Sequence, residues 1–178
     1  MKVILTGATG FIGSHVLAEL QKQDHEVTAL VRDDNQANIV AARGATPTVV
    51  DLYDRPAVVN VLTNADGAIH TASPGDATSA DLDSAVVDAV IEAFTGTGKP
   101  YIEISGIWIY GANTSITEES PFHAPALVAW PVRWLISTIG SMSGMTVRAA
   151  QLARIDSRPS TIARARRSTS SATFGPAP

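Results

Sequence analysis

The stretch "LTGATGFIGSHV", residues 5–16, carries three glycines at intervals of three residues, at Gly7, Gly10 and Gly13. It overlaps the end of "KVILT" (2–6), a short apolar run of the kind that forms a buried strand. The following residues 10–23, "GFIGSHVLAELQKQ", have apolar side chains at helical spacing. We expect the inner side of this helix to carry Phe11, Ile12, Val16, Leu17 and Leu20. The glycines are therefore predicted to lie in a tight turn from a buried strand into a helix.

The same alternation of strands and helices continues beyond this turn. The segment "EVTALVR" (26–32) predicts a second strand, and "GMTVRAAQL" (144–152) is a weaker candidate for a sixth. Between them we expect strands at 46–50, 67–72 and 101–105, and helices near 36–43, near 55–63 and at 79–97. Such alternation predicts a parallel sheet with helices on both faces, because right-handed crossovers return each helix to the sheet. The fold class is therefore α/β, with a doubly wound parallel sheet.

The composition suits one globular domain and excludes several kinds of site. The chain has 178 residues, of which 45% are hydrophobic, and it contains no cysteine. Disulfides and thiolate metal sites are therefore excluded, and the four histidines are too scattered in the sequence to predict a metal site. No apolar run approaches the ~20 residues that span a bilayer, and the first residues do not have the pattern of a signal peptide. We expect a cytoplasmic protein without a membrane partner.

The charged residues divide the chain near Trp130. Residues 1–130 hold 16 of the 17 Asp and Glu but only six of the 13 Lys and Arg, whereas residues 131–178 hold seven Arg and a single acid, Asp156. The later segment is rich in Arg, Ser, Thr, Ala and Pro without apolar periodicity, so we expect it to be partly disordered. Without interleaved aromatic residues it is not expected to bind nucleic acid, and a shifted reading frame is another origin for its composition. We predict a folded domain at 1–130 and a basic segment at 131–178.

A turn from a parallel strand into a helix is suited to binding a phosphate. The first backbone N–H groups of a helix lack partners within the helix, and their partial positive charge favours an anion. In this role Gly7 allows the sharp turn, Gly10 lets a pyrophosphate approach the backbone, and Gly13 lets the helix pack close to the strand. A purely structural turn is the alternative. The place of the glycines at the first junction of a long alternating pattern favours a nucleotide.

Four stretches follow one another in the order of a known set of motifs: "TGATGFIGSHV" (6–16), "VVDLYD" (49–54), "AIHTAS" (68–73) and "YIEISGIWIYG" (101–111). Together they resemble the extended short-chain dehydrogenases/reductases, the NAD(P)-dependent epimerase/dehydratase family, over residues 2–123. The resemblance implies a Rossmann-type sheet and an NAD(P) cofactor. In the first stretch the implied cofactor contacts are Gly7, Thr9, Gly10, Phe11, Ile12 and Gly13. In the next two they are Asp51 and Leu52 beside the adenine, and Thr71, Ala72 and Ser73 beneath the cofactor.

The choice between NADP and NAD depends on the end of the second strand. An acid at this place would bind a ribose 2′-hydroxyl, but Val31 occupies it. Arg32, next to it, resembles the arginine of NADP-preferring members, and its guanidinium suits a 2′-phosphate. A solvated arginine at a strand end is the structural alternative. We therefore expect NADP, with NAD as the other candidate because Asp33 and Asp34 follow.

The catalytic residues that the resemblance implies are only partly present. The family uses a Ser or Thr to hold the substrate oxygen, and a Tyr with a Lys four residues later to transfer its proton. Ser105 matches the first role. No Tyr-x-x-x-Lys occurs in the chain, whose tyrosines are Tyr53, Tyr101 and Tyr110. Tyr110 remains the candidate proton donor, although lowering its pKa from ~10 requires a nearby cation and no lysine follows Lys99.

Two functions of different classes follow from these residues. The resemblance implies an NAD(P)-dependent oxidoreductase or epimerase that acts on a small carbonyl, alcohol or nucleotide-sugar substrate, here with impaired catalytic machinery. It also implies a C-terminal substrate part of ~100 residues or more, which we expect to be truncated in this chain. The alternative is a non-catalytic NADP(H)-binding sensor or pseudoenzyme. The expected partner is a small-molecule substrate, and a second copy of the chain is a candidate partner in a homodimer.

Overall fold

The described residues form six strands, four α-helices and one short 3-10 helix in a computed structural model of the chain. These residues are 1–104, 106–112, 115–117, 120–121, 123 and 147–150. The strands are β1 (Lys2–Thr6), β2 (Glu26–Val31), β3 (Thr46–Val49), β4 (Gly67–His70), β5 (Tyr101–Ile104) and β6 (Val147–Ala150). The helices are α1 (Phe11–Lys22), α2 (Asp34–Ala42), α3 (Arg55–Thr63), α4 (Ser79–Phe94) and η1 (Ile107–Tyr110). Every predicted element is present, and the predicted strand at 67–72 and helix at 79–97 end earlier, at His70 and Phe94.

All strand pairs of the sheet are parallel, in the order β3-β2-β1-β4-β5-β6. The chain first moves outward from β1 to β3 and then crosses back to β4, so the direction of winding reverses between β1 and β4. Thr6 at the end of β1 is in register with His70 at the end of β4. In open sheets of this kind a ligand binds outside the carboxyl ends of the strands at this reversal. The predicted Rossmann-type sheet is confirmed, and its switch point lies directly after Thr6.

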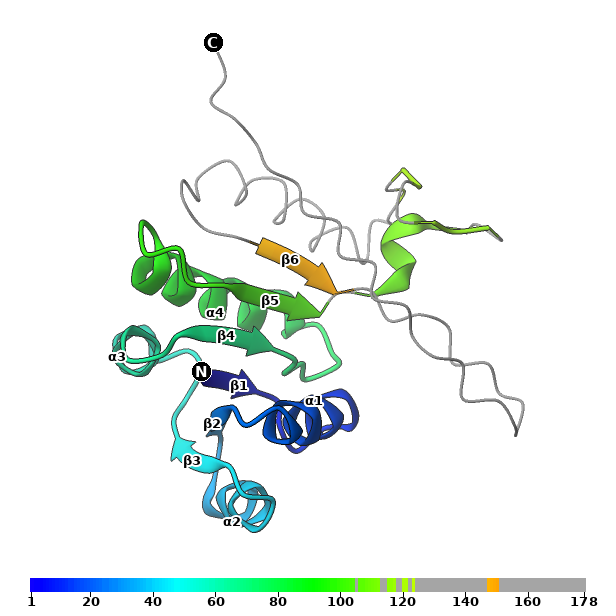
Figure 1. The fold of residues 1–178 in the computed structure, drawn as a ribbon. Coiled ribbons are helices and arrows are strands. Elements are labelled where there is room, and N and C mark those ends of the chain that lie inside the picture. Colours follow the sequence, from blue (N-terminus) through cyan, green and yellow to red (C-terminus); the bar gives the residue numbers. More distant parts are fainter. Residues whose placement is uncertain (105, 113–114, 118–119, 122, 124–146, 151–178) are drawn as a thin grey trace, which may run out of the picture.

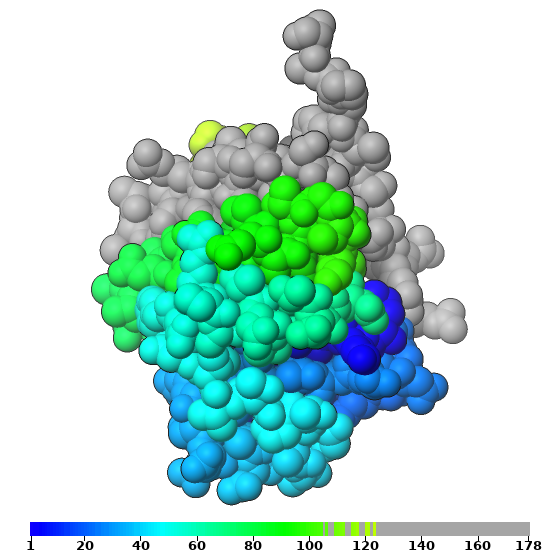
Figure 2. All heavy atoms as spheres, turned by 90° about the vertical axis from the view of Figure 1, so that its left-hand side faces the viewer, coloured from blue at the N-terminus to red at the C-terminus, as the bar shows by residue number. Residues whose placement is uncertain are grey.

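Two hydrophobic cores lie on opposite faces of the sheet (Figure 1). Alternate residues of each strand point to opposite faces, so that Ile4 belongs to one core and its neighbour Leu5 to the other. The first core contains buried residues of α3 and α4, among them Leu62 and Phe94. The second contains Leu17 of α1 and Val40 of α2. Figure 2 shows the molecule from the side of α3 and α4. Helices cover both faces, as a doubly wound sheet requires.

The start of α1 differs from the prediction at one residue. Phe11, placed on the inner side of the helix, is 73% exposed. As the first residue of α1 it lies just beyond the carboxyl end of β1, where no strand remains to cover the ring; its ring instead stacks at a tilt on His15, with the centroids 4.9 Å apart. Leu17 is buried, and Val16 and Leu20 pack against the second core as predicted.

Other predictions concern residues that the structure describes only in part. The basic segment at 131–178 and its predicted disorder lie outside the described residues, except for β6 at Val147–Ala150. Among the described helices, none is long and apolar enough to cross a membrane. The division into domains and the cellular compartment stay predictions.

Candidate functional site

The three glycines of the turn after β1 have different surroundings. Gly7 has a φ of +71°, and a Cβ on it would lie 2.6 Å from the amide nitrogen of Ala72. A Cβ on Gly13 would lie 2.6 Å from the carbonyl carbon of Gly7. Contacts this short are sterically excluded, so both glycines are required by the packing of the turn itself. Gly10 is exposed, and a Cβ there would meet only the Gly7 carbonyl oxygen, at 3.3 Å. The absence of a side chain at Gly10 therefore leaves space that the protein does not fill.

The N-terminus of α1 begins at this open glycine. Gly10 is the N-cap residue and supplies no side-chain hydrogen bond to the first turn, which contains no acidic residue. Its backbone N–H donates to the Gly7 carbonyl oxygen at 2.9 Å, which closes the turn. The N–H groups of the first helical turn carry a partial positive charge that an anion outside the helix can neutralise. The turn therefore combines an accessible backbone with an electrostatic preference for a phosphate.

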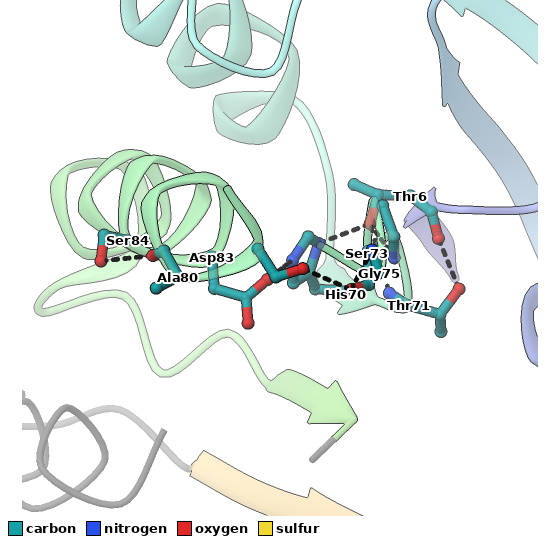
Figure 3. Close-up of polar contacts among 10 residues, drawn as sticks. Thr6, His70, Thr71, Ser73, Gly75, Ala80, Asp83 and Ser84 are labelled. Carbon is teal, nitrogen blue, oxygen red and sulfur yellow. Dashed lines mark hydrogen bonds and ion pairs between the residues drawn. The ribbon is translucent and has the colours of Figure 1, made fainter. Parts of the chain in front are cut away.

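The segment after β4 is held against this turn by the hydroxyl of Thr6 (Figure 3). The backbone N–H groups of Thr71 and Ala72 donate to Thr6 Oγ1 at 3.2 and 3.3 Å. In return Thr71 Oγ1 donates to the Thr6 carbonyl oxygen at 2.7 Å. Ser73, the next residue, is exposed and donates through Oγ to Ser79 Oγ at 3.2 Å, at the start of α4. The segment 71–73 thus lies beside the glycine turn, as the sequence motifs imply for the floor of a nucleotide site.

The loops after β2 and β3 reach the same edge of the sheet. Arg32, directly after β2, is exposed, and its backbone N–H donates to Gln36 Oε1 at 3.2 Å. The backbone N–H of Val50 donates to the Val31 carbonyl oxygen at 2.9 Å and so joins the two strand ends. Asp51 follows, exposed, and accepts a hydrogen bond from the backbone of Tyr53, whereas Leu52 is buried in the first core. Because the strands are parallel, the expected adenosine contacts lie on the edge that carries the glycine turn.

The remaining predicted nucleotide contacts lie in or next to α1. Thr9 and Ile12 are half-buried, and Phe11 exposes its ring beside Gly10. The ring of Phe11 is therefore available at the surface of the site rather than to the core.

The predicted catalytic residues are described only in part. Ser105 lies outside the described residues. Tyr110 ends η1 and is 4% exposed. The next residue, Gly111, has a φ of +68°, and a Cβ on it would lie 2.6 Å from the carbonyl oxygen of His123. His123 in turn donates its backbone N–H to Ile109 at 2.9 Å. The Tyr-Gly step is thus a closely packed turn after β5, and the chemistry of Ser105 and Tyr110 stays a prediction.

A buried polar cluster beneath the site was not predicted from the sequence. His70 is 2% exposed at the end of β4. Its Nδ1 lies 2.6 Å from Thr6 Oγ1, and its Nε2 lies 3.1 Å from Asp83 Oδ1 on α4. The available signal was a polar histidine in an otherwise apolar strand, "GAIH" (67–70), because a buried polar side chain requires a partner. The partner itself, on a helix 13 residues later, had no such signal.

Two further ionisable residues on β5 lie near this cluster. Glu103 is in register with His70 on the neighbouring strand. Burial raises the pKa of Glu103 to about 8, and the negative charge of Asp83 adds to the effect. Burial also raises the pKa of Tyr101 well above its usual value, and within the described part of the chain its hydroxyl has no hydrogen-bond partner. The Glu103 carboxyl group is therefore mainly neutral near pH 7.

The cavity next to these side chains is too small to be a ligand pocket. It has a volume of about 10 Å³ and is lined by Thr6, His70 and Tyr101 together with apolar residues of both sheet and helices. A space of this size is at the lower limit for one water molecule. The nucleotide site is therefore the open edge above the sheet, and the buried cluster lies below it.

Comparison with known proteins agrees with this arrangement. Residues 7–127 match the model of a family described as NAD(P)H-binding. An uncharacterized protein of Schizosaccharomyces pombe is 34% identical over 123 residues, which are 67% of this chain and 42% of that protein. The chain spans about half the length of the curated relatives it matches.

Solved structures with the same fold include nucleotide complexes. The UDP-glucose 4-epimerase of Thermus thermophilus in complex with NAD has a TM-score of 0.68 at 22% identity, over 84% of this chain and 54% of the epimerase. The yeast methylglyoxal/isovaleraldehyde reductase Gre2 with NADPH has a TM-score of 0.60 at 19% identity, over 84% of this chain and 56% of the reductase. At these identities the likeness concerns the fold.

Proposed function

Because the chain belongs to the NAD(P)H-binding family, we propose that the turn after β1 and the segment after β4 together bind NADP(H), as the nucleotide-binding part of an oxidoreductase or epimerase. The observation that carries this proposal is the open N-terminus of α1. Gly10 leaves unfilled space outside the turn, and no side chain caps the helix at this residue. A pyrophosphate bound there accepts hydrogen bonds from the first helical turn and neutralises its partial charge.

The other strand ends give the nucleotide a direction. With the pyrophosphate at the start of α1, the adenosine extends toward Arg32 and toward Asp51 and Leu52, and the nicotinamide toward the ends of β4 and β5. Asp33 is held at the start of α2, where its carboxylate accepts from the backbone of Gln36 at 2.8 Å. This leaves the exposed guanidinium of Arg32 as the charged group for a 2′-phosphate and supports NADP(H) over NAD(H).

The proposed substrate is a small carbonyl, alcohol or nucleotide-sugar. Bound NADP(H) supplies or accepts the hydride at the substrate carbon. Ser105 is the candidate hydrogen-bond donor to the substrate oxygen, and Tyr110 is the candidate for its proton. The epimerase and the aldehyde reductase among the similar structures support a reaction of this general type. Residues outside this chain's span of its relatives contribute to the substrate site in the whole protein.

The nucleotide proposal is tested by filling the open space at Gly10. We expect Gly10→Val to abolish detectable binding of NADPH in calorimetry, because the new side chain projects into the volume of the pyrophosphate. The matched control is Ala18→Val, which enlarges an exposed residue further along the same helix. Both variants are expected to keep the far-UV circular dichroism of the wild type. Undiminished NADPH affinity in Gly10→Val would sink the proposal.

A second function is favoured by one sequence observation, the absence of any Tyr-x-x-x-Lys. In this alternative the chain binds NADP(H) as a sensor or pseudoenzyme without hydride transfer. Turnover of NADPH with a panel of aldehydes, ketones and sugars, measured on a sample that binds NADPH, separates the two functions. Oxidation of NADPH that is lost in both Ser105→Ala and Tyr110→Phe supports the enzyme, and binding without turnover supports the sensor.

A further inference from the structure

A chain of three buried polar side chains connects α4 to the nucleotide edge of the sheet. It runs from Asp83 through His70 to Thr6, with 13% of the Asp83 side chain and 3% of the His70 side chain exposed. Figure 3 shows His70 between the other two. In a mainly apolar core, such a network specifies one arrangement of its members only if every donor and acceptor is satisfied. Neither His70 nor Asp83 is among the residues expected to touch the nucleotide.

The hydrogen bonds determine where each proton of this chain lies. A threonine hydroxyl has one proton and two lone pairs. The backbone N–H groups of Thr71 and Ala72 use both lone pairs of Thr6 Oγ1. The hydroxyl proton is therefore donated to His70 Nδ1, which must be the unprotonated ring nitrogen. The proton of the neutral ring is then on Nε2 and is donated to Asp83 Oδ1.

From this arrangement we propose that Asp83 and His70 are positioning residues of the nucleotide site, which act through Thr6 to hold the segment after β4 against the glycine turn. The inference rests on the proposed nucleotide function. Without an acceptor at Asp83, the Nε2–H group of His70 is buried without its partner, which favours the other tautomer. That tautomer directs a proton from Nδ1 at Thr6 Oγ1. The hydroxyl can then no longer accept from both backbone N–H groups.

The segment held by Thr6 has little freedom to move without affecting the glycine turn. A Cβ on Gly7 would already lie 2.6 to 2.7 Å from backbone atoms of Thr71 and Ala72, so the two backbones are in close contact. The carbonyl oxygen of the same Gly7 accepts the hydrogen bond that closes the turn before α1. A change at Thr6 is therefore transmitted directly to the backbone that is proposed to bind the pyrophosphate.

The first experiment measures NADPH affinity by calorimetry on the full chain. We expect Asp83→Ala to weaken binding about threefold to tenfold, the equilibrium effect of one lost hydrogen bond. Asp83→Asn, which keeps an oxygen acceptor for His70, is expected to bind within about twofold of the wild type. The control is Asp81→Ala, an exposed acid in the first turn of the same helix, which is expected to leave affinity unchanged. Equal affinities for Asp83→Ala and Asp81→Ala would overturn the proposal.

The second experiment reads the proton positions by ¹⁵N NMR of the histidine ring without nucleotide. The wild type and Asp83→Asn are expected to carry the His70 proton on Nε2, and Asp83→Ala to show a shift toward the Nδ1 form. A purely structural role for Asp83 would lower stability without changing the tautomer. A wild-type His70 protonated on Nδ1 would overturn the inference, and this measurement needs no variant, so it holds even if Asp83→Ala does not fold.

The outcomes separate this inference from the proposed function. A wild type that binds neither NADPH nor NADH contradicts the proposed function, and with it the role of the buried chain in nucleotide binding. A wild type that binds NADPH, together with an Asp83→Ala variant of unchanged tautomer and affinity, contradicts the inference alone. Binding by the wild type with coupled changes in tautomer and affinity supports both.

Discussion

The helices that follow β1, β2 and β3 begin in two different ways. Before α2 and α3 stands an aspartate, Asp33 or Asp54, whose carboxylate accepts the backbone N–H of the third following residue, at 2.8 and 3.1 Å. Before α1 stands Gly10, with no side chain to offer. Aspartate is among the best N-cap residues because it satisfies a donor that the helix itself cannot. The start of α1 is the exception among these three junctions.

This difference teaches how a helix start is reserved for a ligand. A cap already present at α2 and α3 occupies the place in which an external anion would bind. At α1 the same place is left open, and Gly7 and Gly13 bring the turn close to the segment after β4. The comparison implies that stability and binding respond in opposite ways at the two kinds of junction. Each of the following changes is expected to break or to sharpen it.

The largest effect is expected from giving α1 the cap of its neighbours. Gly10 has φ −75° and ψ 173°, which any residue adopts, so Gly10→Asp is compatible with the backbone. Glycine and aspartate differ by only a few tenths of a kcal/mol as N-caps, so we expect the free energy of unfolding to change by less than ~0.5 kcal/mol. NADPH affinity is expected to fall by ~100-fold or more, because a carboxylate replaces the phosphate at the N–H groups.

Calorimetry and urea unfolding of the same Gly10→Asp sample measure the two quantities. The neutral variant Gly10→Asn is the control and is expected to lose less affinity, because it adds a similar volume without the charge. If Gly10→Asp and the wild type bind NADPH equally, α1 is not the phosphate site and the comparison between the junctions fails.

A buried carboxyl group sharpens the contrast with the exposed aspartates. The pKa of Glu103 is raised by burial from its usual 4.5 to about 8, so the folded state favours its neutral form. Its stabilising effect is fully present below about pH 4.5 and is lost as the pH rises through about 8. We therefore expect Glu103→Gln, which is always neutral, to gain stability relative to the wild type over this range, on the order of a few kcal/mol.

The measurement is urea unfolding of the wild type and Glu103→Gln at both ends of that pH range. Subtracting the two proteins removes the contribution of all other titrating groups. A difference in unfolding free energy that is the same at both ends would show that Glu103 titrates alike in the folded and unfolded chains.

Arg32 tests which nucleotide the site prefers. Hydrogen bonds to charged groups contribute about 1.5 to 3 kcal/mol, so Arg32→Ala is expected to weaken NADP(H) binding by about ten- to a hundredfold. NAD(H), which has no 2′-phosphate, is expected to bind with little change. Calorimetry with both nucleotides measures the two losses. Equal losses would assign Arg32 a role in structure rather than in selection of the nucleotide.

The smallest effect is expected at a capped junction. Asp54→Ala removes the hydrogen bond to the backbone of Ala57, and a lost aspartate cap costs about 1 kcal/mol of stability. The α3 helix lies on the far side of the reversal from the glycine turn, so NADPH affinity is expected to remain within about twofold. A large loss of affinity in Asp54→Ala, without unfolding, would mean that the junctions are not as independent as the comparison requires.

Much of the framework was predictable from local sequence. The strand and helix positions follow from apolar periodicity, which is a property of neighbouring residues, and the predicted boundaries agree with the structure to within a few residues. The roles of Gly7 and Gly13 in close packing were also expected from their spacing, and the contacts of the turn agree with them. The nucleotide contacts of Thr9, Arg32, Asp51 and Ser73 stay predictions, because they concern a molecule outside the protein.

The sequence by itself thus determined the parallel α/β sheet, its glycine turn and the family of the chain, because these depend on residues close together along the chain. Only the tertiary structure decided that Phe11 is exposed, and that Thr6 and His70, 64 residues apart, form one hydrogen-bonded unit with Asp83. The physical reason is that a buried polar group is stable only with a partner, and the partner is chosen by the packing of strands and helices rather than by sequence distance.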